Sequence, residues 1–498
     1  MNGLELIRAA NPHLKPLGDY INLAEWGEKL LNDPLAGVDR RGISERERKL
    51  LLKQSRTRFE PTQGSIAIVS SIQDMLWGRV TFGNPLLPAN RFRTVQALAQ
   101  RGKSLVDAPW LPDFADALMV MGCTAVGKST AIKRYVIQID QFYVHPRCEE
   151  AEWTRQIQVT YLIVPMPVHR GGLLYAILAA LDSTIGTTFR SQYADHRRWP
   201  IEKLAIEVGI ILVQHAVGVL IIEEIQARNF SMAPNREEML LFILRVLNFG
   251  VPVVLVGNPL GFVGLDEFSQ DINRLTENEP IHLMPADIAD KEWTEGLGPG
   301  MWSHNVMPRH TRWSAAIGSE LHACSAGFPG YVRKATDGAQ LIAMGEDAQA
   351  VDLSHLKRYR EKSRTFTMNR GLIEGFAEKD PLKLMKYLDV PWEQYGQDWG
   401  KLSLADIAEA SRDATETTDP SIDEEGKAAL RSVHQRIRAA AAAQATRTAN
   451  KSVRRAGVRP AGDAAGAVTK GALAAGLDAL RRGLAAKEPK ETQGQDEA

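Results

Sequence analysis

Residues 117–130 read ALMVMGCTAVGKST, and this stretch decides the fold. An apolar run comes first, Gly122, Gly127, Lys128 and Ser129 then fit the spacing G-x4-G-K-[ST], and a helical pattern follows directly. Glycines let the backbone curl so that its N–H groups and the helix N-terminus face a phosphate, whose charge the lysine neutralises. The sequence therefore predicts a phosphate-binding loop between a strand and a helix.

The cofactors that this loop predicts are ATP and Mg²⁺, with the hydroxyl of Ser129 as a magnesium ligand. The alternative is a chance glycine-rich turn, which the order of strand, loop and helix disfavours. The residues expected to contact the nucleotide are Gly122, Thr124, Ala125, Val126, Gly127, Lys128, Ser129 and Thr130.

A second apolar run, GVLIIEEIQ at residues 218–226, ends in two carboxylates. We expect Glu223 to hold the magnesium through water, and Glu224 to orient or deprotonate the attacking water. Asp is more usual at the first place, and the longer Glu leaves the metal geometry and the hydrolysis rate open. The alternative is a solvated acid pair at a strand end, which is common without any chemistry.

Three further polar residues are candidates for the γ-phosphate. Asn258 ends the run VPVVLVGN and is expected to position the attacking water, although an isolated Asn is often only a turn former. Arg274 and Arg333 could each bring a guanidinium group, one from a neighbouring subunit and the other from a lid. For each arginine the alternative is a surface salt bridge.

Short apolar runs alternate with helical patterns from about residue 115 to 286, which predicts an α/β fold with a five-stranded parallel sheet flanked by helices. The helical segments between the runs repeat apolar residues every three to four positions. The five runs are ALMVMG, VTYLIVPM, VGVLIIEE, VPVVLVGN and EPIHLMP.

The chain has 498 residues with 60 basic and 60 acidic side chains, and its hydrophobic content of 44% excludes collagen-like and wholly disordered classes. The zero net charge conceals an asymmetry. Residues 427–498 carry a net charge of +8, and residues 1–426 carry −8. Mean charge therefore does not exclude a nucleic-acid partner.

Compartment is indicated by the cysteines and by apolar run lengths. Three dispersed cysteines show neither a zinc-site spacing nor an even disulfide framework, which favours a reducing interior. The N-terminus lacks a secretory pattern, and no stretch of about 18 apolar residues runs without a charge. We expect a cytoplasmic protein with no membrane partner.

The loop, the double-acid strand, the polar strand end and a helical lid with an arginine together resemble an AAA+ ATPase core. Two further segments narrow the resemblance to TnsC/TniB-type ATPases of bacterial heteromeric transposons, including CRISPR-associated ones. Residues 58–91 resemble the segment that precedes the loop in this family, with Asn84 and Pro85 as its Asn-Pro pair, although Gly83 stands where an arginine is common. Residues 325–356 resemble its lid.

The resemblance, which spans roughly residues 55–360, implies a bacterial ATPase that assembles head-to-tail around duplex DNA as a ring or filament. It implies a link between a target selector (TniQ- or TnsD-like, or another) and the transposase, with slow, regulatory Mg-dependent hydrolysis that drives disassembly. DNA-facing residues of the family lie in loops between the second and third strands, which makes Arg170, Thr188 and Arg190 candidates. Solvated surface residues are the alternative.

The expected organisation has five parts. They are a partner-contacting N-terminal helical extension at residues 1–110, the AAA+ α/β domain at 111–286, a helical lid at 287–365, a C-terminal helical extension at 366–412, and an acidic spacer with a disordered, basic, Ala-rich tail at 413–498. The tail is read as a DNA-seeking arm, as a peptide that folds on a partner, or as a solubilising end. Residues 293–313, rich in Gly and Trp, are expected to pack their own aromatic rings.

Other readings stay open. A helicase-loader or initiator-type ATPase would want an added helix-turn-helix domain, and no clear one follows residue 365. A STAND-type signalling ATPase would want C-terminal repeats of about 20 to 50 residues. A nucleotide-gated scaffold with negligible turnover is compatible with Glu223 in place of Asp.

Overall fold

The computed structural model describes residues 11–104, 115–146, 156–233, 235–265 and 269–401. The acidic spacer, the basic tail and the end of the predicted C-terminal extension lie outside these ranges.

The central sheet has five parallel strands in the order β4-β5-β6-β1-β7. The apolar runs therefore predicted it correctly. Because β1 lies between β6 and β7, the loop at its carboxyl end is flanked by the ends of neighbouring strands. The strands are β1 (Ala117–Gly122), β4 (Tyr161–Pro165), β5 (Val219–Ile225), β6 (Val253–Gly257) and β7 (Ile281–Leu283).

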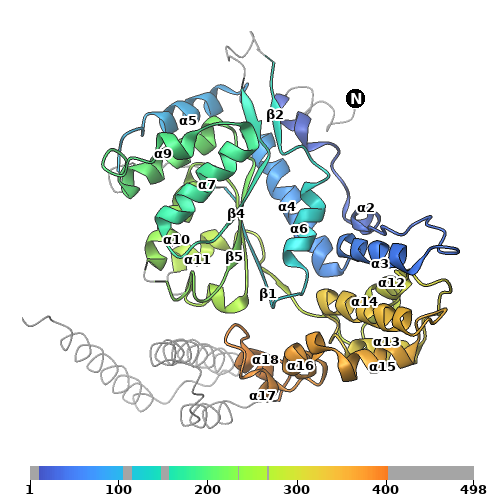
Figure 1. Ribbon diagram of the computed structural model, residues 1–498. Helices are drawn as coiled ribbons and strands as arrows, with labels where there is room; N and C mark the ends of the chain where they lie inside the picture. Colours follow the sequence, from blue (N-terminus) through green and yellow to red (C-terminus); the bar gives the residue numbers. More distant parts are fainter. Residues whose placement is uncertain (1–10, 105–114, 147–155, 234, 266–268, 402–498) are drawn as a thin grey trace, which may run out of the picture. The chain divides into compact units, whose positions relative to one another are not determined.

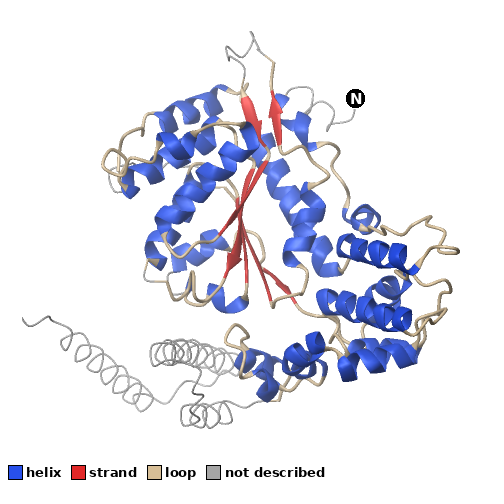
Figure 2. Ribbon diagram, viewed as in Figure 1, coloured by secondary structure: helices blue, strands red, loops and turns tan. Residues whose placement is uncertain are grey.

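Helices cover both faces of the sheet (Figures 1 and 2). Strand side chains alternate between the faces, so Leu118 and Val120 join one buried cluster while Ala117 and Met119 join the other. One face is covered by α4 (Gln63–Phe82) and α6 (Lys128–Val136). The other is covered by α5 (Pro88–Leu98), α7 (Arg170–Ile185), α8 (Phe189–Gln192), α9 (Ile201–Gln214), α10 (Arg236–Asn248) and α11 (Ser269–Leu275).

Helix α4 ties the N-terminal part of the chain to the sheet. It begins with a capping box, in which the Ser65 N–H donates to the Thr62 hydroxyl and the Thr62 N–H donates to the Ser65 hydroxyl. Its apolar side chains join the cluster that contains Leu118 and Val120. The segments before it are η1 (Pro12–Leu17), η2 (Leu23–Glu25), α2 (Trp26–Leu30), α3 (Glu45–Lys53) and η3 (Gln54–Thr57).

A two-stranded antiparallel sheet was not predicted from the sequence. It pairs β2 (Phe142–Val144) with β3 (Ile157–Val159), so that the run VTYLIVPM divides between two sheets. Thr160, which separates β3 from β4, donates its N–H to the carbonyl of Gln141 at 2.8 Å. Three-residue strands are too short to show a periodicity of their own.

In the described residues after β7, helices make up the regular structure apart from one isolated bridge between Arg309 and Ala350. The aromatic segment at 293–313 packs as expected, because Trp293 and Trp302 are buried and Trp293 meets Trp313 edge to face at 6.3 Å. The short turn after β6 is η4 (Pro259–Phe262). The later helices are η6 (Glu292–Leu297, a π-helix), α12 (Gly298–Ser303), α13 (Ala315–Ala323), α14 (Pro329–Gly345), α15 (Leu353–Lys362), α16 (Arg364–Ala377), α17 (Pro381–Leu384) and α18 (Trp392–Asp398). Among the described helices, none is long and apolar enough to cross a lipid bilayer.

Candidate nucleotide-binding site

The loop between β1 and α6 has the backbone of a phosphate-binding loop. Ala125 and Gly127 have left-handed φ angles of 72° and 107°, and α6 begins at the next residue, Lys128. A Cβ atom at Gly122 would lie 2.8 Å from the carbonyl oxygen of Leu283, so a side chain there would push β1 away from β7. Gly127 is therefore required by the tight turn, and Gly122 is required by the close approach of β1 to β7.

Lys128 closes this loop. Its Nζ donates to the carbonyl oxygens of Gly122 at 2.6 Å and of Cys123 at 3.0 Å. Burial lowers the pKa of Lys128 to about 8, and the fall is opposed by the charges of Cys123, Glu224, Asp389 and Glu223. A partly desolvated ammonium gains most from a charged partner, and a phosphate group is one.

Two cavities adjoin the loop, and both are lined by Ala125, Gly127 and Thr130. The larger, of about 200 Å³, is lined by Thr124, Ala125, Gly127, Lys128, Ser129, Thr130, Glu224, Ile225, Gln226, Val256, Gly257 and Asn258. The smaller, of about 150 Å³, is lined by Arg56, Arg58, Phe59, Glu60, Thr62, Ser65, Ala125, Val126, Gly127, Thr130, Leu283, Leu297, Met301, Pro329, Gly330 and Arg333. The structure thus brings the predicted loop, Glu224 and Asn258 together at one cavity and Arg333 at the other.

The two carboxylates lie where β5 departs from regular pairing. The register between β5 and β6 shifts between Ile222 and Ile225, and Glu224 has a left-handed φ of 61°. A non-glycine residue in this region costs about 1–3 kcal/mol and is found at functional sites. The Glu224 carboxylate accepts a hydrogen bond from Gln226 Nε2 at 3.0 Å. The bulge therefore turns Glu224 into the larger cavity.

Asn229 holds this bulge and was not predicted from the sequence. Its Nδ2 donates to the carbonyl of Glu224 at 2.7 Å and to that of Met166 at 2.9 Å, while its Oδ1 accepts from the N–H of Gln226 at 2.8 Å. Asn229 is buried, and these bonds satisfy both ends of its amide. It is a positioning residue, because it fixes the backbone that carries Glu224.

Replacement of Asn229 by Ala is expected to lower the free energy of unfolding by about 2 kcal/mol and to slow ATP hydrolysis. Urea unfolding and a phosphate-release assay would measure the two effects. Ser231→Ala is the matched control, since Ser231 is also buried in this segment but donates to Leu260 O at 2.7 Å. Equal hydrolysis by both variants would remove the positioning role from Asn229.

Ser129 lines the larger cavity, whereas Glu223, the other residue predicted to hold magnesium, is not among the residues that line either cavity. The Oε1 atom of Glu223 is buried without a hydrogen-bond partner, which is costly unless a cation or water meets it. No group of three or more His, Cys, Asp or Glu residues that could hold a metal occurs in the described part of the chain. Mg²⁺ commonly takes one or two protein ligands and completes its shell with phosphates and water.

Arg333 lies on α14, beside the smaller cavity. Its Nη1 pairs with Asp337 Oδ2 at 3.1 Å, and Asp337 also accepts from the Ser55 hydroxyl at 2.7 Å. The start of α14 contacts the loop directly, since the Gly330 N–H donates to Ala125 O at 3.1 Å. Arg274 lies on α11 and is not among the residues that line either cavity. Its contact with a γ-phosphate across a subunit interface therefore stays a prediction.

The N-terminal wall of the smaller cavity is a second feature that sequence reasoning missed. Arg58 is buried, pairs with Asp33 at 2.9 Å and with Glu60 at 2.7 Å, and donates to Gly300 O at 2.7 Å. These bonds join the segment before α4 to α12. The family resemblance of residues 58–91 pointed to this segment, but it did not single out Arg58 or its ion pairs.

The three predicted DNA-contacting residues lie in two environments. The Arg170 side chain is 8% exposed and pairs with Glu202 and Glu238, so a contact with DNA requires these ion pairs to open. Thr188 and Arg190 are exposed at the start of α8, which Asp182 fixes by accepting from Phe189 N at 2.7 Å and from Arg190 N at 2.9 Å.

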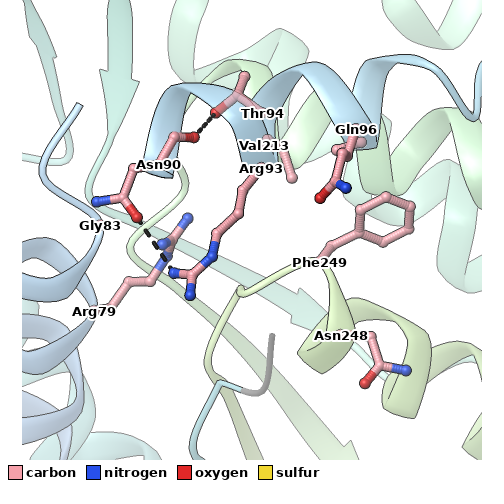
Figure 3. Close-up of a pocket in the computed structure, with 10 residues that line it drawn as sticks. Arg79, Gly83, Asn90, Arg93, Thr94, Gln96, Val213, Asn248 and Phe249 are labelled. Atoms are coloured by element: carbon pink, nitrogen blue, oxygen red, sulfur yellow. Dashed lines mark hydrogen bonds between the residues drawn. The ribbon is translucent and has the colours of Figure 1, made fainter. Parts of the chain in front are cut away.

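The Asn-Pro turn lies apart from both nucleotide cavities. Asn84 and Pro85 join α4 to α5, and a small polar cavity of about 50 Å³ lies beside them (Figure 3). A Cβ atom at Gly83 would come within 2.6 Å of Arg79 Nη1, so the Arg79 guanidinium already lies beside the position where the resembling family often has an arginine. Arg93 Nη1 donates to Asn90 Oδ1 at 3.3 Å across this cavity.

Comparison with known protein families agrees with the fold. Residues 115–265 match the AAA domain family, which is a family of nucleotide-hydrolysing ATPases. This range contains the loop, both carboxylates and Asn258. The described chain therefore has the AAA+ P-loop fold.

Solved structures with a similar arrangement were also found. One is Drosophila ORC bound to DNA, at 12% identity and a TM-score of 0.33, covering 74% of this chain and 79% of that one. A second is the Aeropyrum pernix ORC1 protein in complex with DNA, at 15% identity and a TM-score of 0.33, covering 71% and 85%. A third is Thermotoga maritima RuvB, at 14% identity and a TM-score of 0.30, covering 62% and 81%. A comparison with curated protein sequences found no match.

Proposed function

We propose that this protein binds ATP with Mg²⁺ between the phosphate-binding loop and the ends of β5 and β6, and hydrolyses it slowly. The observation that carries this proposal is a single cavity lined by Lys128, Ser129, Glu224 and Asn258. Phosphoryl transfer needs a cation for the phosphates and a hydroxyl for the metal. It also needs a carboxylate and an amide for the attacking water.

In this proposal each residue has one task. Loop N–H groups and Lys128 hold the β- and γ-phosphates, and Ser129 and Glu223 would hold a Mg²⁺ ion, which when bound would neutralise part of the phosphate charge. Asn258 positions the attacking water, and Glu224 takes its proton. Arg333 supplies a guanidinium group from the lid to the γ-phosphate. Because Gly330 of the lid bonds to Ala125 of the loop, a change at the phosphates can move α14.

We further propose that the ATP-bound protein oligomerises on duplex DNA and regulates transposition as a link between a target selector and a transposase. The support is the resemblance of residues 58–91 and 325–356 to the transposition regulators. Both segments contribute residues to the smaller cavity, among them Arg58 and Arg333, so a nucleotide-driven change would reach them first.

Negative-stain microscopy with duplex DNA and a non-hydrolysable ATP analogue tests this proposal. Rings or filaments that form on DNA with the analogue, and not with ADP, are the expected result. Particles that remain monomeric under both conditions would overturn the assembly and leave a nucleotide-gated protein of another class. Assembly on DNA that does not stimulate a transposase would leave the oligomer and remove the transposition role.

Replacement of Arg190 by Ala is expected to weaken DNA binding several-fold and to lower the slope of log K against log salt by about one. Fluorescence anisotropy over a salt series would measure this. Arg364→Ala, an exposed cation at the start of α16, is the matched control. Arg170→Ala should instead lower stability, because it removes the packing of a buried side chain together with its ion pairs to the exposed Glu202 and Glu238. An unchanged slope for Arg190→Ala would exclude it from the DNA contact.

A further inference from the structure

The C-terminal extension is anchored on the phosphate-binding loop by a buried aromatic side chain. The Tyr395 hydroxyl of α18 lies 3.4 Å from Cys123 Sγ in the loop and 3.2 Å from His282 Nε2 in β7. The rings of Tyr395 and His282 stack at 5.9 Å, and Tyr395 is fully buried. Removing such a side chain from water fixes this segment firmly against the loop.

This anchor places Asp389 beside Asn258, the residue that is expected to position the attacking water. Asn258 Nδ2 donates to Asp389 Oδ2 at 3.2 Å, although 131 residues separate the two in sequence. Val390 and Trp392, which follow Asp389, are buried in the same core cluster as Tyr395. Asp389 itself is exposed, so its backbone is held while its side chain is able to turn.

The Asp389 charge also reaches the loop lysine. Together with Glu224 and Glu223 it favours the charged form of Lys128, which burial disfavours. Asp389 is not itself among the residues that line the larger cavity, but it accepts a hydrogen bond from Asn258 and its charge acts on Lys128, and both of these residues line that cavity. Lys128 and Asn258 are also the groups that a γ-phosphate needs as cation and donor.

A carboxylate and a γ-phosphate compete for these groups. Asp389 occupies one of the two N–H donors of the Asn258 amide, so that donor is unavailable to a phosphate oxygen or its water, and two anions close together repel. A nucleoside diphosphate ends before this position and does not meet the competitor. The arrangement therefore penalises a triphosphate and leaves a diphosphate almost unaffected.

We propose that Asp389 is a nucleotide-discriminating residue, through which the C-terminal extension weakens the binding of ATP relative to ADP. The inference rests on the proposed function of the site as an ATP site. Any partner or rearrangement that withdraws residues 387–391 from Asn258 would relieve the penalty, and ATP binding would in turn favour withdrawal, because such coupling is reciprocal. The extension would thus set the ATP concentration at which the protein changes from the ADP-bound to the ATP-bound form.

The test compares the affinities of ADP and of the non-hydrolysable analogue adenylyl imidodiphosphate by calorimetry on the full-length protein. Asp389→Asn removes the charge and keeps an oxygen that can accept from Asn258, so the carboxyl geometry is preserved. Asp398→Asn is the matched control, since it removes a charge from an exposed position of the same segment. Asp389→Ala serves as a second variant that removes the hydrogen bond as well.

With Asp389→Asn and Asp389→Ala, the dissociation constant of the analogue divided by that of ADP is expected to fall roughly threefold to tenfold, the size of a nearby like charge. Asp398→Asn should leave this ratio unchanged. An unchanged ratio in both Asp389 variants would overturn the inference while the ATP site stands. Hydrolysis that falls without a change in the ratio would also overturn it and make Asp389 a positioning residue for Asn258. If the wild type binds neither nucleotide, the proposed function itself fails.

Discussion

Replacement of Lys128 by Ala is expected to abolish binding of ATP and, with it, nucleotide-dependent assembly on DNA. Lys128 is the cation of the loop, and its partly buried ammonium gives up solvation that a phosphate anion replaces. Loss of a charge-assisted contact to phosphate corresponds to about 3 kcal/mol, or roughly a hundredfold in affinity. Calorimetry and microscopy with duplex DNA would measure the two losses.

The same substitution is expected to leave the protein folded. Burial lowers the pKa of Lys128, which means that the charged side chain is less favourable in the folded protein than in the unfolded chain at neutral pH. Its removal should therefore not lower the melting temperature, while the rise in melting temperature on addition of ATP disappears. Lys133→Ala, an exposed lysine on the same helix, should retain that rise. ATP-dependent oligomers that persist with Lys128→Ala would contradict the proposed function.

The sheet and the phosphate-binding loop could be predicted because their signals are local. Each of the five strands is a short apolar run, and buried parallel strands need such runs on both faces. The residues that follow those runs, Lys128, Glu224 and Asn258, had to meet because parallel strands end at the same edge. The sequence placed each of them at the end of an apolar run without predicting the order of the strands, and one cavity contains all three.

Contacts made by loops and by distant helices could not be predicted in this way. Asn229 was not singled out from the sequence, because the left-handed backbone of Glu224 that it supports leaves no mark on the sequence. Asp389 lay in a segment outside the family resemblance, and only packing brings it to Asn258. Sequence separation hides such pairs, since many arrangements of a helical extension satisfy the same amphipathic pattern.

Charge was informative only when the positions of the charged side chains were considered. Zero net charge concealed a basic tail, which lies outside the described residues. Arg170 looked like a free cation next to Arg190, but α9 and α10 supply the carboxylates of Glu202 and Glu238 that surround it. A count of arginines therefore does not measure the charge that a protein can present to DNA.

Replacement of Glu224 by Gln is expected to slow ATP hydrolysis by roughly a hundredfold to ten-thousandfold while ATP still binds. Gln has the size of Glu and keeps a Cβ atom, so the left-handed backbone and its support by Asn229 remain. What is lost is the proton acceptor for the attacking water. The protein should therefore accumulate in the ATP form, and its assemblies on DNA should persist longer than those of the wild type.

Single-turnover hydrolysis and the lifetime of DNA-bound assemblies after removal of free ATP would measure these effects together. Glu237→Gln, an exposed acid at the start of α10, is the matched control and should match the wild type in both. Glu223→Gln should have a different effect from Glu224→Gln. Loss of the carboxylate predicted to hold the metal should raise the magnesium concentration that hydrolysis needs. Assemblies that dissociate faster with Glu224→Gln than in the wild type would remove Glu224 from its role and separate disassembly from hydrolysis.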